Sequence, residues 1–389
     1  MSSSISPTES APESGAGTSG VPARPRVALL FGGRSSEHAI SCLTAASVLS
    51  VIDPEKFDVL PIGVSREGRW VLADPQSAQL ARGESRLPEV VADSAAVVLH
   101  SGSGHSELLS TEPGEVPRVL GEVDVVFPLF HGPFGEDGTI QGLLELADVR
   151  YVGAGVLASA VGMDKAFMKL IFRSAGLSVG DFEVVTDRDW RFHREESLAR
   201  CAALGWPLFV KPARAGSSVG ISRVTEAADL AAAIEFARAE DPKVIVEAAI
   251  VGREIECAVL QGRDGAAPRT SLPGEIVTSD SHALYDFEAK YLDADGAVLS
   301  CPADLPAEAI ERIRQQAAQA FDAVGAEGLS RVDFFYTGSG DVVINEINTM
   351  PGFTPSSMYP RMWAASGLDY PSLVEELLTL ALERPVGLR

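Results

Sequence analysis

Strand-like and helix-like stretches alternate through residues 26–150 of this 389-residue chain. The run VALLFGG predicts a strand followed by a glycine turn, and residues 37–49 predict a helix. FDVLPIGVS and VDVVFPLF predict two more strands, and GTIQGLLELADV predicts another helix. Because strands that alternate with helices pair in parallel, this region predicts a doubly wound α/β sheet. Residues 66–118 carry scattered Pro, Gly and Ser with weak periodicity, so we expect irregular connections and an insertion there.

The sequence changes in character near residue 153. A helix at MDKAFMKLIFRSAG, several short strands and an alanine-rich helix follow, and a third region mixes strands with two helices near the end of the chain. The first residues are dense in Ser, Pro, Gly and Thr, which is typical of a disordered tail. We therefore divide the chain into a tail (1–25), an N-terminal α/β domain (26–153), a central domain (154–246) and a C-terminal domain (247–389).

Charge and cysteine content exclude several classes of function. Asp and Glu number 54 against 32 Lys and Arg, which gives a formal net charge of −22. Nucleic acids and anionic membrane surfaces would repel such a chain, so we expect neither as a partner. No apolar run approaches the roughly 18 residues of a membrane span. The four cysteines are far apart and lack CxxC spacing, which favours reduced thiols in a cytoplasmic protein.

The stretch RVDFFYTGSGDVVINEIN, residues 331–348, carries the most informative chemistry. Two apolar strands flank a Gly-Ser-Gly turn, which predicts a hairpin. A turn centred on Ser339-Gly340 places Asp333 opposite Glu346 and Arg331 opposite Asn348, with all four on one face. Polar alternation on an exposed hairpin face is the ordinary explanation. Two carboxylates directly opposite each other, however, repel without a cation, so we favour a site for Mg²⁺.

Two lysines precede loops or turns that suit a phosphate ligand. In KPARAGSSVG the lysine, Lys211, ends a strand, and the glycine–serine turn leads into another strand, which differs from a P-loop. Backbone N–H groups and serine hydroxyls would then hold the phosphate. Lys165 is expected in the first turn of a helix, with Asp164 near the cap. Taken alone, KPARAGSSVG also suits an ordinary Gly-Ser turn between strands, and Lys165 a tolerated surface position.

Further candidates lie at the ends of predicted strands. The strand KVIVEAAI ends in acceptors and an open backbone edge that could pair with an adenine, and Glu254 could accept from a ribose hydroxyl. His131 and Glu37 follow strands of the first domain, where open α/β sheets bind ligands. The long loop 279–293 predicts a lid that brings Lys290 and Tyr291 over the site. Residues 153–158 fit G-x-G-x-x-A, but we interpret them as a tight turn.

Taken together, these motifs resemble those of the D-alanine–D-alanine ligases of the ATP-grasp superfamily. The resemblance extends from residue 27 to residue 358 and rests on FGGRSSEHAIS, HGPFGEDGTIQG, VGMDK, KPARAGSSVG, YDFEAKY, RVDFF and NEINTMPGFTPSSM, in family order. It implies a three-domain ATP-grasp fold and ATP-dependent formation of D-alanyl-D-alanine, through an acyl phosphate, for cell-wall synthesis. A cytoplasmic homodimer is the family expectation.

The resemblance also implies roles for individual residues. It assigns to ATP, bound between the central and C-terminal domains, the side chains Lys165, Lys211, Ser218, Glu247, Glu254 and Lys290. It assigns to two Mg²⁺ or Mn²⁺ ions Asp333, Glu346 and Asn348. Catalytic roles fall on Glu37, Ser217, Tyr291, Arg331 and Gly352. D-alanine contacts fall on His131, Ser357 and Met358.

Three alternatives remain open on sequence grounds. A D-alanine–D-lactate ligase shares the same motifs, although Tyr291 favours the dipeptide-forming type. A non-catalytic nucleotide-binding regulator would have lost part of the set Arg331, Asp333, Glu346 and Asn348, and all four are present. An oxidoreductase that uses residues 153–158 is the most remote of the three.

Overall fold

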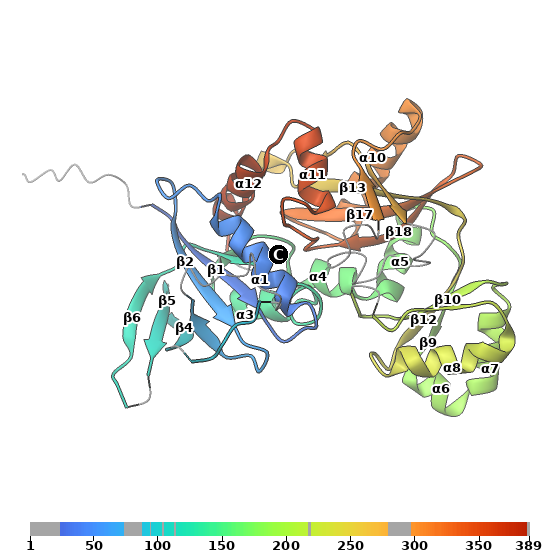
Figure 1. The fold of residues 1–389 in the computed structure, drawn as a ribbon, viewed down its shortest axis with the longest axis horizontal. Coiled ribbons are helices and arrows are strands. Elements are labelled where there is room, and N and C mark those ends of the chain that lie inside the picture. Colours follow the sequence, from blue (N-terminus) through green and yellow to red (C-terminus); the bar gives the residue numbers. More distant parts are fainter. Residues whose placement is uncertain are drawn as a thin grey trace, which may run out of the picture.

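The computed structural model describes residues 24–73, 88–93, 95–102, 105–112, 114–216, 219–278 and 297–386. Within these ranges the chain forms an eight-stranded, a four-stranded and a six-stranded sheet (Figure 1). No helix in the described part is long and apolar enough to cross a membrane. Most of the segment predicted to be a tail (residues 1–23) and all of the segment predicted to be a lid (residues 279–293) lie outside the described residues.

The N-terminal sheet has the strand order β6-β5-β4-β3-β2-β1-β7-β8. Its strands are β1 (Arg26–Gly32), β2 (Asp58–Val64), β3 (Trp70–Leu72), β4 (Ala96–Gly102), β5 (His105–Thr111), β6 (Arg118–Glu122), β7 (Val125–Pro128) and β8 (Arg150–Tyr151). Helices α1 (His38–Leu49) and α3 (Thr139–Leu146) alternate with its parallel strands β2, β1, β7 and β8, as predicted.

Residues 66–118 correct the sequence-based expectation. Instead of irregular connections alone, they contain strands β3, β4 and β5 and the start of β6, which extend the parallel sheet by antiparallel pairing. Only β5 and β4 form a long continuous ladder, from Ala96↔Thr111 to Gly102↔His105. Polar residues stand on both faces of this edge of the sheet, which explains why the sequence shows no clean alternation.

The four-stranded sheet has the order β11-β10-β12-β9. Its elements are β9 (Phe182–Val185), β10 (Leu208–Pro212), β11 (Ser222–Val224), β12 (Val244–Ala248) and the helices α6 (Asp187–Phe192), α7 (Arg194–Ala202) and α8 (Ala227–Arg238). Alanine and leucine side chains of α8 pack against β10. Together with neighbouring residues of this sheet they form a separate small hydrophobic core. Because β12 lies between β10 and β9, the open backbone edge expected from the sequence is not present along this strand.

The six-stranded sheet carries the predicted hairpin. Its strands run in the order β16-β15-β13-β17-β18, and β14 pairs with β13. The elements are β13 (Gly252–Leu260), β14 (Arg269–Thr270), β15 (Gly274–Thr278), β16 (Ala297–Ser300), α10 (Ala307–Ala323), β17 (Leu329–Thr337) and β18 (Val342–Asn348), with a 3₁₀ turn at Arg263–Gly265. Helices α4 (Val156–Met163) and α5 (Lys165–Ser174) share a buried core with this sheet and α10.

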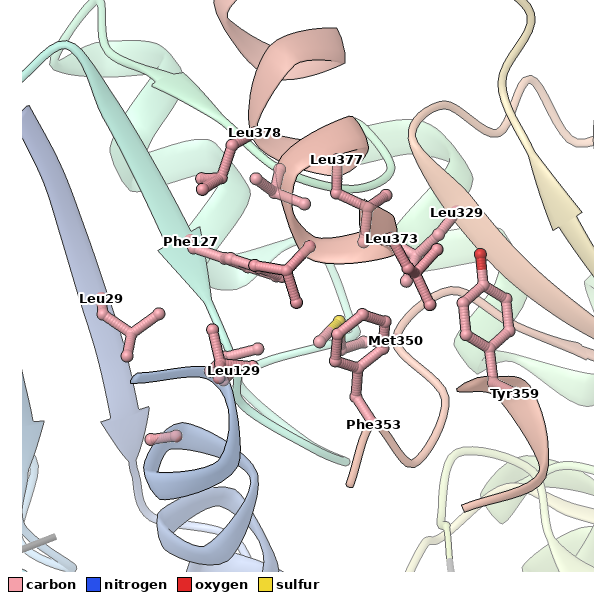
Figure 2. Close-up of a cluster of buried hydrophobic side chains, with 14 of the residues drawn as sticks. Leu29, Phe127, Leu129, Leu329, Met350, Phe353, Tyr359, Leu373, Leu377 and Leu378 are labelled. Atoms are coloured by element: carbon pink, nitrogen blue, oxygen red, sulfur yellow. The ribbon is translucent and has the colours of Figure 1, made fainter. Parts of the chain in front are cut away.

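The largest core joins the first sheet to the end of the chain. Helix α12 (Tyr370–Glu383) packs against β7 and β8, and α11 (Met358–Ala365) packs against α12 and β13, so the end of the chain joins the first sheet to the six-stranded sheet (Figure 1). Figure 2 shows Phe353 between the strand residue Phe127 and the helix residue Leu373. The rings of Phe127 and Phe353 meet edge-on at 6.1 Å between centroids. This packing fixes the loop after β18 against the N-terminal sheet.

Candidate active site

The β17–β18 hairpin has the register that the sequence predicts at its functional end. The cross-strand pairs there are Asp333 with Glu346 and Arg331 with Asn348. Nearer the turn the prediction is off by one residue, since Phe334 pairs with Ile344 and residues 338–340 form the turn. One extra residue of β18, Asn345, bulges between these two registers. The bulge compensates for the shorter turn, so the predicted pairs form.

Arg331 lies at the centre of an ionic cluster on this face. Its guanidinium contacts both carboxylate oxygens of Asp333, at 2.7 and 2.6 Å, and Glu256 Oε1 at 3.0 Å. The amide of Asn348 donates to Asp333 Oδ2 at 3.0 Å. Burial disfavours the charged guanidinium, but the Asp333 and Glu256 carboxylates outweigh it and raise the pKa of Arg331. The arginine therefore stays charged, and two carboxylates hold its orientation.

Two groups of charged residues face each other across the site. We call the β17–β18 hairpin face around Arg331 the carboxylate wall, and Glu247 with the lysines that contact it the lysine wall. Glu247, on β12, lies 2.7 Å from Lys169 Nζ and 2.5 Å from Lys211 Nζ, and its side chain is 9% exposed. Burial raises the pKa of Glu247, yet the two ammonium groups outweigh it and hold this pKa far below its usual range. The Glu247 side chain thus neutralises two buried lysines, and the sequence had indicated only its contact with the nucleotide.

Lys165 connects the two walls. It is the first residue of α5, and Asp164 caps that helix by accepting from the N–H groups of Ala166 and Phe167, as the sequence predicts. Lys165 Nζ donates to Ala215 O at 3.0 Å and lies 3.5 Å from Glu346 Oε2. A lysine in the first turn opposes the helix dipole, so a carboxylate partner or an anionic ligand is needed to favour it there.

A cavity of about 300 Å³ lies between these walls. Elements of the four-stranded and six-stranded sheets and of α5 surround it. Its lining includes nine of the residues that the sequence singles out or that the ionic clusters contain: Lys165, Lys169, Lys211, Glu247, Glu254, Arg331, Asp333, Glu346 and Asn348. The exposed Glu254 stands on β13, where the cavity opens. The structure therefore gathers both predicted lysines and the whole predicted ligand set around one space.

Two predicted residues of the N-terminal domain, Glu37 and His131, are not among the residues that line this cavity. Glu37 immediately precedes α1, in the N-cap position but without a side-chain capping bond, and is 6% exposed. A Cβ added to Gly216 would lie 2.9 Å from Glu37 Oε2, so the glycine–serine loop reaches the N-terminal domain at this point. His131 is buried between Thr44 Oγ1, at 3.3 Å, and the carbonyl of Met350, at 3.1 Å. Burial lowers the pKa of His131, which favours the neutral imidazole.

The loop after β18 carries the remaining predicted contacts. Gly352 stands between the buried residues Met350 and Phe353. Ser357 immediately precedes α11 and makes no side-chain capping bond to it; its hydroxyl lies 2.8 Å from that of Thr354. The side chain of Met358 is only 5% exposed and belongs to the large core. A role in binding D-alanine would therefore use the backbone of Met358. Ser217, Ser218, Lys290 and Tyr291 lie outside the described residues.

The chemistry of the hairpin face fits a hard divalent cation. Asp333, Glu346 and Asn348 offer carboxylate and amide oxygens on one face of a sheet beside the cavity. In the described part of the chain, no group of three or more His, Cys, Asp or Glu side chains is placed so that it could hold a metal ion by itself. The like-charge pair is instead neutralised by Arg331 and Lys165. A bound cation would take over that part of the neutralisation.

Three residues of the site were not predicted from the sequence. Lys169 follows Lys165 by one helical turn, and this spacing was the available signal. Glu256 lies on β13, where its carboxylate contacts Arg331. Glu136 stands inside the quoted HGPFGEDG motif and accepts from the N–H groups of Gly132, at 2.6 Å, and Met350, at 3.1 Å. Burial and the charge of Glu37 raise the pKa of Glu136 to about 8.

The dinucleotide-like glycines lie in a bend and short loop between β8 and α4, and residues 156–158 are the start of α4 rather than part of a tight turn. Gly153 has a φ of 102°, and Gly155 caps α4. Only the two-residue strand β8 precedes them. The cysteines agree with the prediction, because all four are free thiols.

Comparison with known proteins places the chain among peptide-forming ligases. A family model described as "D-ala D-ala ligase N-terminus" matches residues 26–154, and one described as "D-ala D-ala ligase C-terminus" matches residues 171–379. A D-alanine–D-alanine ligase of Pseudarthrobacter chlorophenolicus is 63% identical over 96% of this chain and 98% of its own. One from Streptomyces coelicolor is 55% identical over 94% of this chain and 95% of its own.

Solved structures agree with these matches. The VanG D-Ala:D-Ser ligase from Enterococcus faecalis superposes with a TM-score of 0.79, at 37% identity, over 92% of this chain and all of its own. The D-alanine–D-alanine ligase from Coxiella burnetii gives 0.77 at 35% identity, over 93% of this chain and 94% of its own.

The three sheets and the cavity between the second and third define an ATP-grasp fold, with a mixed sheet in its N-terminal domain. The chain belongs to the D-alanine–D-alanine ligase family.

Proposed function

We propose that this protein joins two molecules of D-alanine into D-alanyl-D-alanine at the expense of ATP, as a step in peptidoglycan precursor synthesis. The observation that carries the proposal is the cavity, in which buried lysines face a carboxylate hairpin centred on Arg331. Phosphate requires the cations on one wall, and a divalent metal requires the carboxylates on the other. The 63% identity with named ligases supports the same activity.

ATP would bind with its phosphates toward Lys165 and Lys211. The ammonium of Lys211 already lies against Glu247, so it is fixed in place before the nucleotide arrives. Glu254, at the mouth of the cavity, is positioned to accept from ribose hydroxyls. Ser218 would complete the phosphate contacts from the glycine–serine loop. We assign Glu247 the task of orienting the two lysines, with the adenine beside its strand.

Asp333, Glu346 and Asn348 would hold two Mg²⁺ or Mn²⁺ ions. When bound, these ions neutralise the β- and γ-phosphates and the charge that develops during phosphoryl transfer. The hairpin supplies oxygen ligands whose orientation is set by strand pairing, which is more rigid than a loop.

In the first step, a carboxylate oxygen of one D-alanine attacks the γ-phosphorus. The bond from that phosphorus to the β–γ bridging oxygen breaks, which gives ADP and a D-alanyl phosphate. Glu37 would hold the ammonium of this D-alanine, because it is a buried carboxylate at the N-terminal end of α1, close to Gly216, which lines the cavity. Ser217 and Tyr291 would connect Glu37 to the closing loops, and Lys290 would follow the transferred phosphoryl group. Neutral His131 packs behind Glu37 and shapes this subsite.

In the second step, the neutral amine of another D-alanine attacks the acyl carbon. The tetrahedral oxyanion collapses, the C–O bond to phosphate breaks, and inorganic phosphate leaves together with one proton from the amine. Arg331 and the N–H of Gly352 would stabilise the oxyanion, a type of contact worth roughly 3–4 kcal/mol per donor. The N-terminus of α11, with Ser357 and the backbone of Met358, would hold the second carboxylate.

A coupled assay of ADP release with product analysis tests this function. We expect ADP and D-alanyl-D-alanine in equal amounts from ATP, Mg²⁺ and D-alanine, and no product from L-alanine. Mixtures of D-alanine with D-lactate or D-serine address the alternatives, the latter because the VanG enzyme is named for D-serine. Preferred formation of the ester or of the D-serine dipeptide at neutral pH would contradict the proposal.

We also propose that the protein works in the cytoplasm as a homodimer. Four large apolar side chains lie exposed on the neighbouring helices α3 and α4, namely Leu143, Leu146, Val156 and Leu157. A second copy would cover such a patch. Light scattering after gel filtration should give a dimer, and L146D/L157D should shift it to a monomer, whereas V251D on another exposed position should not. A monomeric wild-type protein would contradict the proposal.

A further inference from the structure

The bulge at Asn345 decides which face of β18 carries Glu346. Before the bulge, Val342 and Ile344 point into the core; after it, Ile347 does, so the buried positions are no longer two residues apart. With an unbroken alternation from Ile344, Glu346 would point into the core and Ile347 toward the cavity. The bulge therefore brings Glu346 and Asn348 to the face that carries Asp333.

Three groups from the segment before β9 bond to the backbone around this bulge. Lys169 Nζ donates to the carbonyl of Asn345 at 2.9 Å, and the N–H of Ile347 donates to Met168 Sδ at 3.3 Å. The N–H of Ile344 donates to Ser178 O at 2.9 Å. A bulged residue loses ladder partners, and a buried backbone group without a partner is costly. β18 is the edge strand of its sheet, so its groups that point away from β17 have no strand to pair with. These contacts supply partners on both sides of the bulge, and Lys169 makes the one that is charged.

Lys169 is itself held firmly. Its side chain is 3% exposed, and its ammonium also contacts Glu247 at 2.7 Å. Its helix begins at the Asp164 cap and packs along β18. An ammonium has three N–H donors, so it can bond to the bulge carbonyl and to the glutamate together. The same side chain thus connects the lysine wall with the hairpin.

We propose that Lys169 is a positioning residue for the metal site, because its bond to the bulged carbonyl of Asn345 keeps Glu346 and Asn348 on the cavity face. This inference rests on the proposed metal-binding role of the hairpin and deepens it. Loss of the bond lets β18 shift between the bulged register and an unbroken one, in which the ligand set is incomplete. Lys169 touches neither the metal ligands' oxygens nor, in this role, the nucleotide.

A competing explanation is that Lys169 acts only through the charge of Glu247. The two explanations predict different variants to be affected. K169M removes both contacts of the ammonium, whereas E247Q removes the ion pair and leaves the bond to Asn345 in place. K169R keeps a cation that can reach both partners. R173M removes a cation one turn further along α5, where Arg173 contacts Gly180 O and Asp181, away from the bulge.

The test is a titration of the full-length protein with Mn²⁺ alone, with the free ion followed by electron paramagnetic resonance. K169M should weaken Mn²⁺ binding by about 10- to 100-fold, the range typical of groups that orient metal ligands. K169R, E247Q and R173M should stay within about threefold of wild type. Thermal unfolding and near-UV circular dichroism establish that each variant is folded.

The outcomes distinguish the positioning role of Lys169 from the metal-binding role of the hairpin. Wild-type Mn²⁺ affinity in folded K169M overturns the positioning role and leaves the proposed function intact. An equal loss in K169M and E247Q also overturns it, because the effect then runs through the charge of Glu247. Failure of the wild-type protein to bind Mn²⁺ contradicts the metal role of the hairpin, and the positioning role falls with it.

Discussion

The two walls of the cavity carry opposite excesses of charge. On the lysine wall, Lys169 and Lys211 share the single carboxylate of Glu247, so cations are in excess. On the carboxylate wall, the guanidinium of Arg331 has Asp333 and Glu256 against it, and Glu346 stands across the hairpin, so carboxylates are in excess. In a chain with a net charge of −22, this separation lets one site attract phosphate and divalent metal together.

The site stays folded without its ligands because the two excesses meet across the cavity. Lys165 Nζ lies 3.5 Å from Glu346 Oε2, so a surplus cation faces a surplus carboxylate. Buried charges that lack partners would cost several kcal/mol each. In the proposed mechanism, bound metal and ATP would replace these side-chain partners: metal would take over at Asp333, and Arg331 would become available to a developing oxyanion. The largest effects should therefore come from changes on the carboxylate wall, where we propose that the chemistry occurs.

Asp333→Asn should give the largest loss. The substitution removes one of the two predicted metal carboxylates and half of the charge that orients Arg331. We expect kcat to fall at least about 100-fold at saturating ATP and Mg²⁺, measured as ADP release. Asp341→Asn, in the turn of the same hairpin, is the control and should keep wild-type activity. Near-normal turnover in Asp333→Asn would remove the carboxylate wall from the mechanism.

Lys211→Met should affect binding more than chemistry. The change removes a charge-assisted contact to phosphate, which is worth roughly 1.5–3 kcal/mol, while Lys169 still neutralises Glu247. We expect the Kd for ATP to rise by about 10- to 100-fold in calorimetry, with Mn²⁺ binding by the hairpin unchanged. Lys56→Met, which removes an exposed lysine paired with Glu375, should not alter either constant. Equal weakening of ATP and Mn²⁺ binding would mean that the walls do not act separately.

Glu37→Gln should have a smaller, pH-dependent effect on stability. The pKa of Glu136 is raised from its ordinary 4.5 to about 8, first by burial and then by the charge of Glu37. Because the folded protein holds this proton more tightly than the unfolded chain, the free energy of unfolding falls as pH rises from about 4.5 through about 8. Removing the charge of Glu37 lowers the pKa of Glu136, so this decline should be shallower.

Urea unfolding at pH 6, 7, 8 and 9 measures that decline. The difference between Glu37→Gln and wild type should grow with pH and stay below about 1.4 kcal/mol, the equivalent of one pKa unit. Glu195→Gln on the exposed first turn of α7 serves as control. A steeper decline in Glu37→Gln would contradict the assigned coupling between the two carboxyl groups.

Much of this site could be predicted from local patterns, and the exceptions have physical causes. The hairpin pairs followed from strand periodicity and turn residues, and the Asp164 cap from its place before Lys165. The bulge at Asn345 could not be predicted, because it is stabilised by α5, which is distant in sequence. The buried contacts of Lys169 likewise depend on tertiary packing.

In the N-terminal domain, too, only the elements with a clear local pattern could be predicted from the sequence. The parallel strands could be predicted from continuous apolar runs, because helices cover both faces of such sheets. Strands β3 to β6 were missed because an antiparallel edge with a solvated face needs no such run. For Glu136, the sequence showed the residue but neither its raised pKa, which comes from burial and the charge of Glu37, nor its hydrogen bond from the backbone N–H of Met350.

Formation of D-alanyl phosphate in the cavity can be followed through the transfer of oxygen from D-alanine to phosphate. D-alanine labelled with ¹⁸O in both carboxylate oxygens is incubated with ATP, Mg²⁺ and the wild-type protein, and the products are analysed by mass spectrometry. A reaction through D-alanyl phosphate transfers one ¹⁸O atom to inorganic phosphate for each dipeptide formed, with ADP as the nucleotide product. Dipeptide formation with unlabelled phosphate, or with the label in AMP, would contradict this account of the cavity and its two walls.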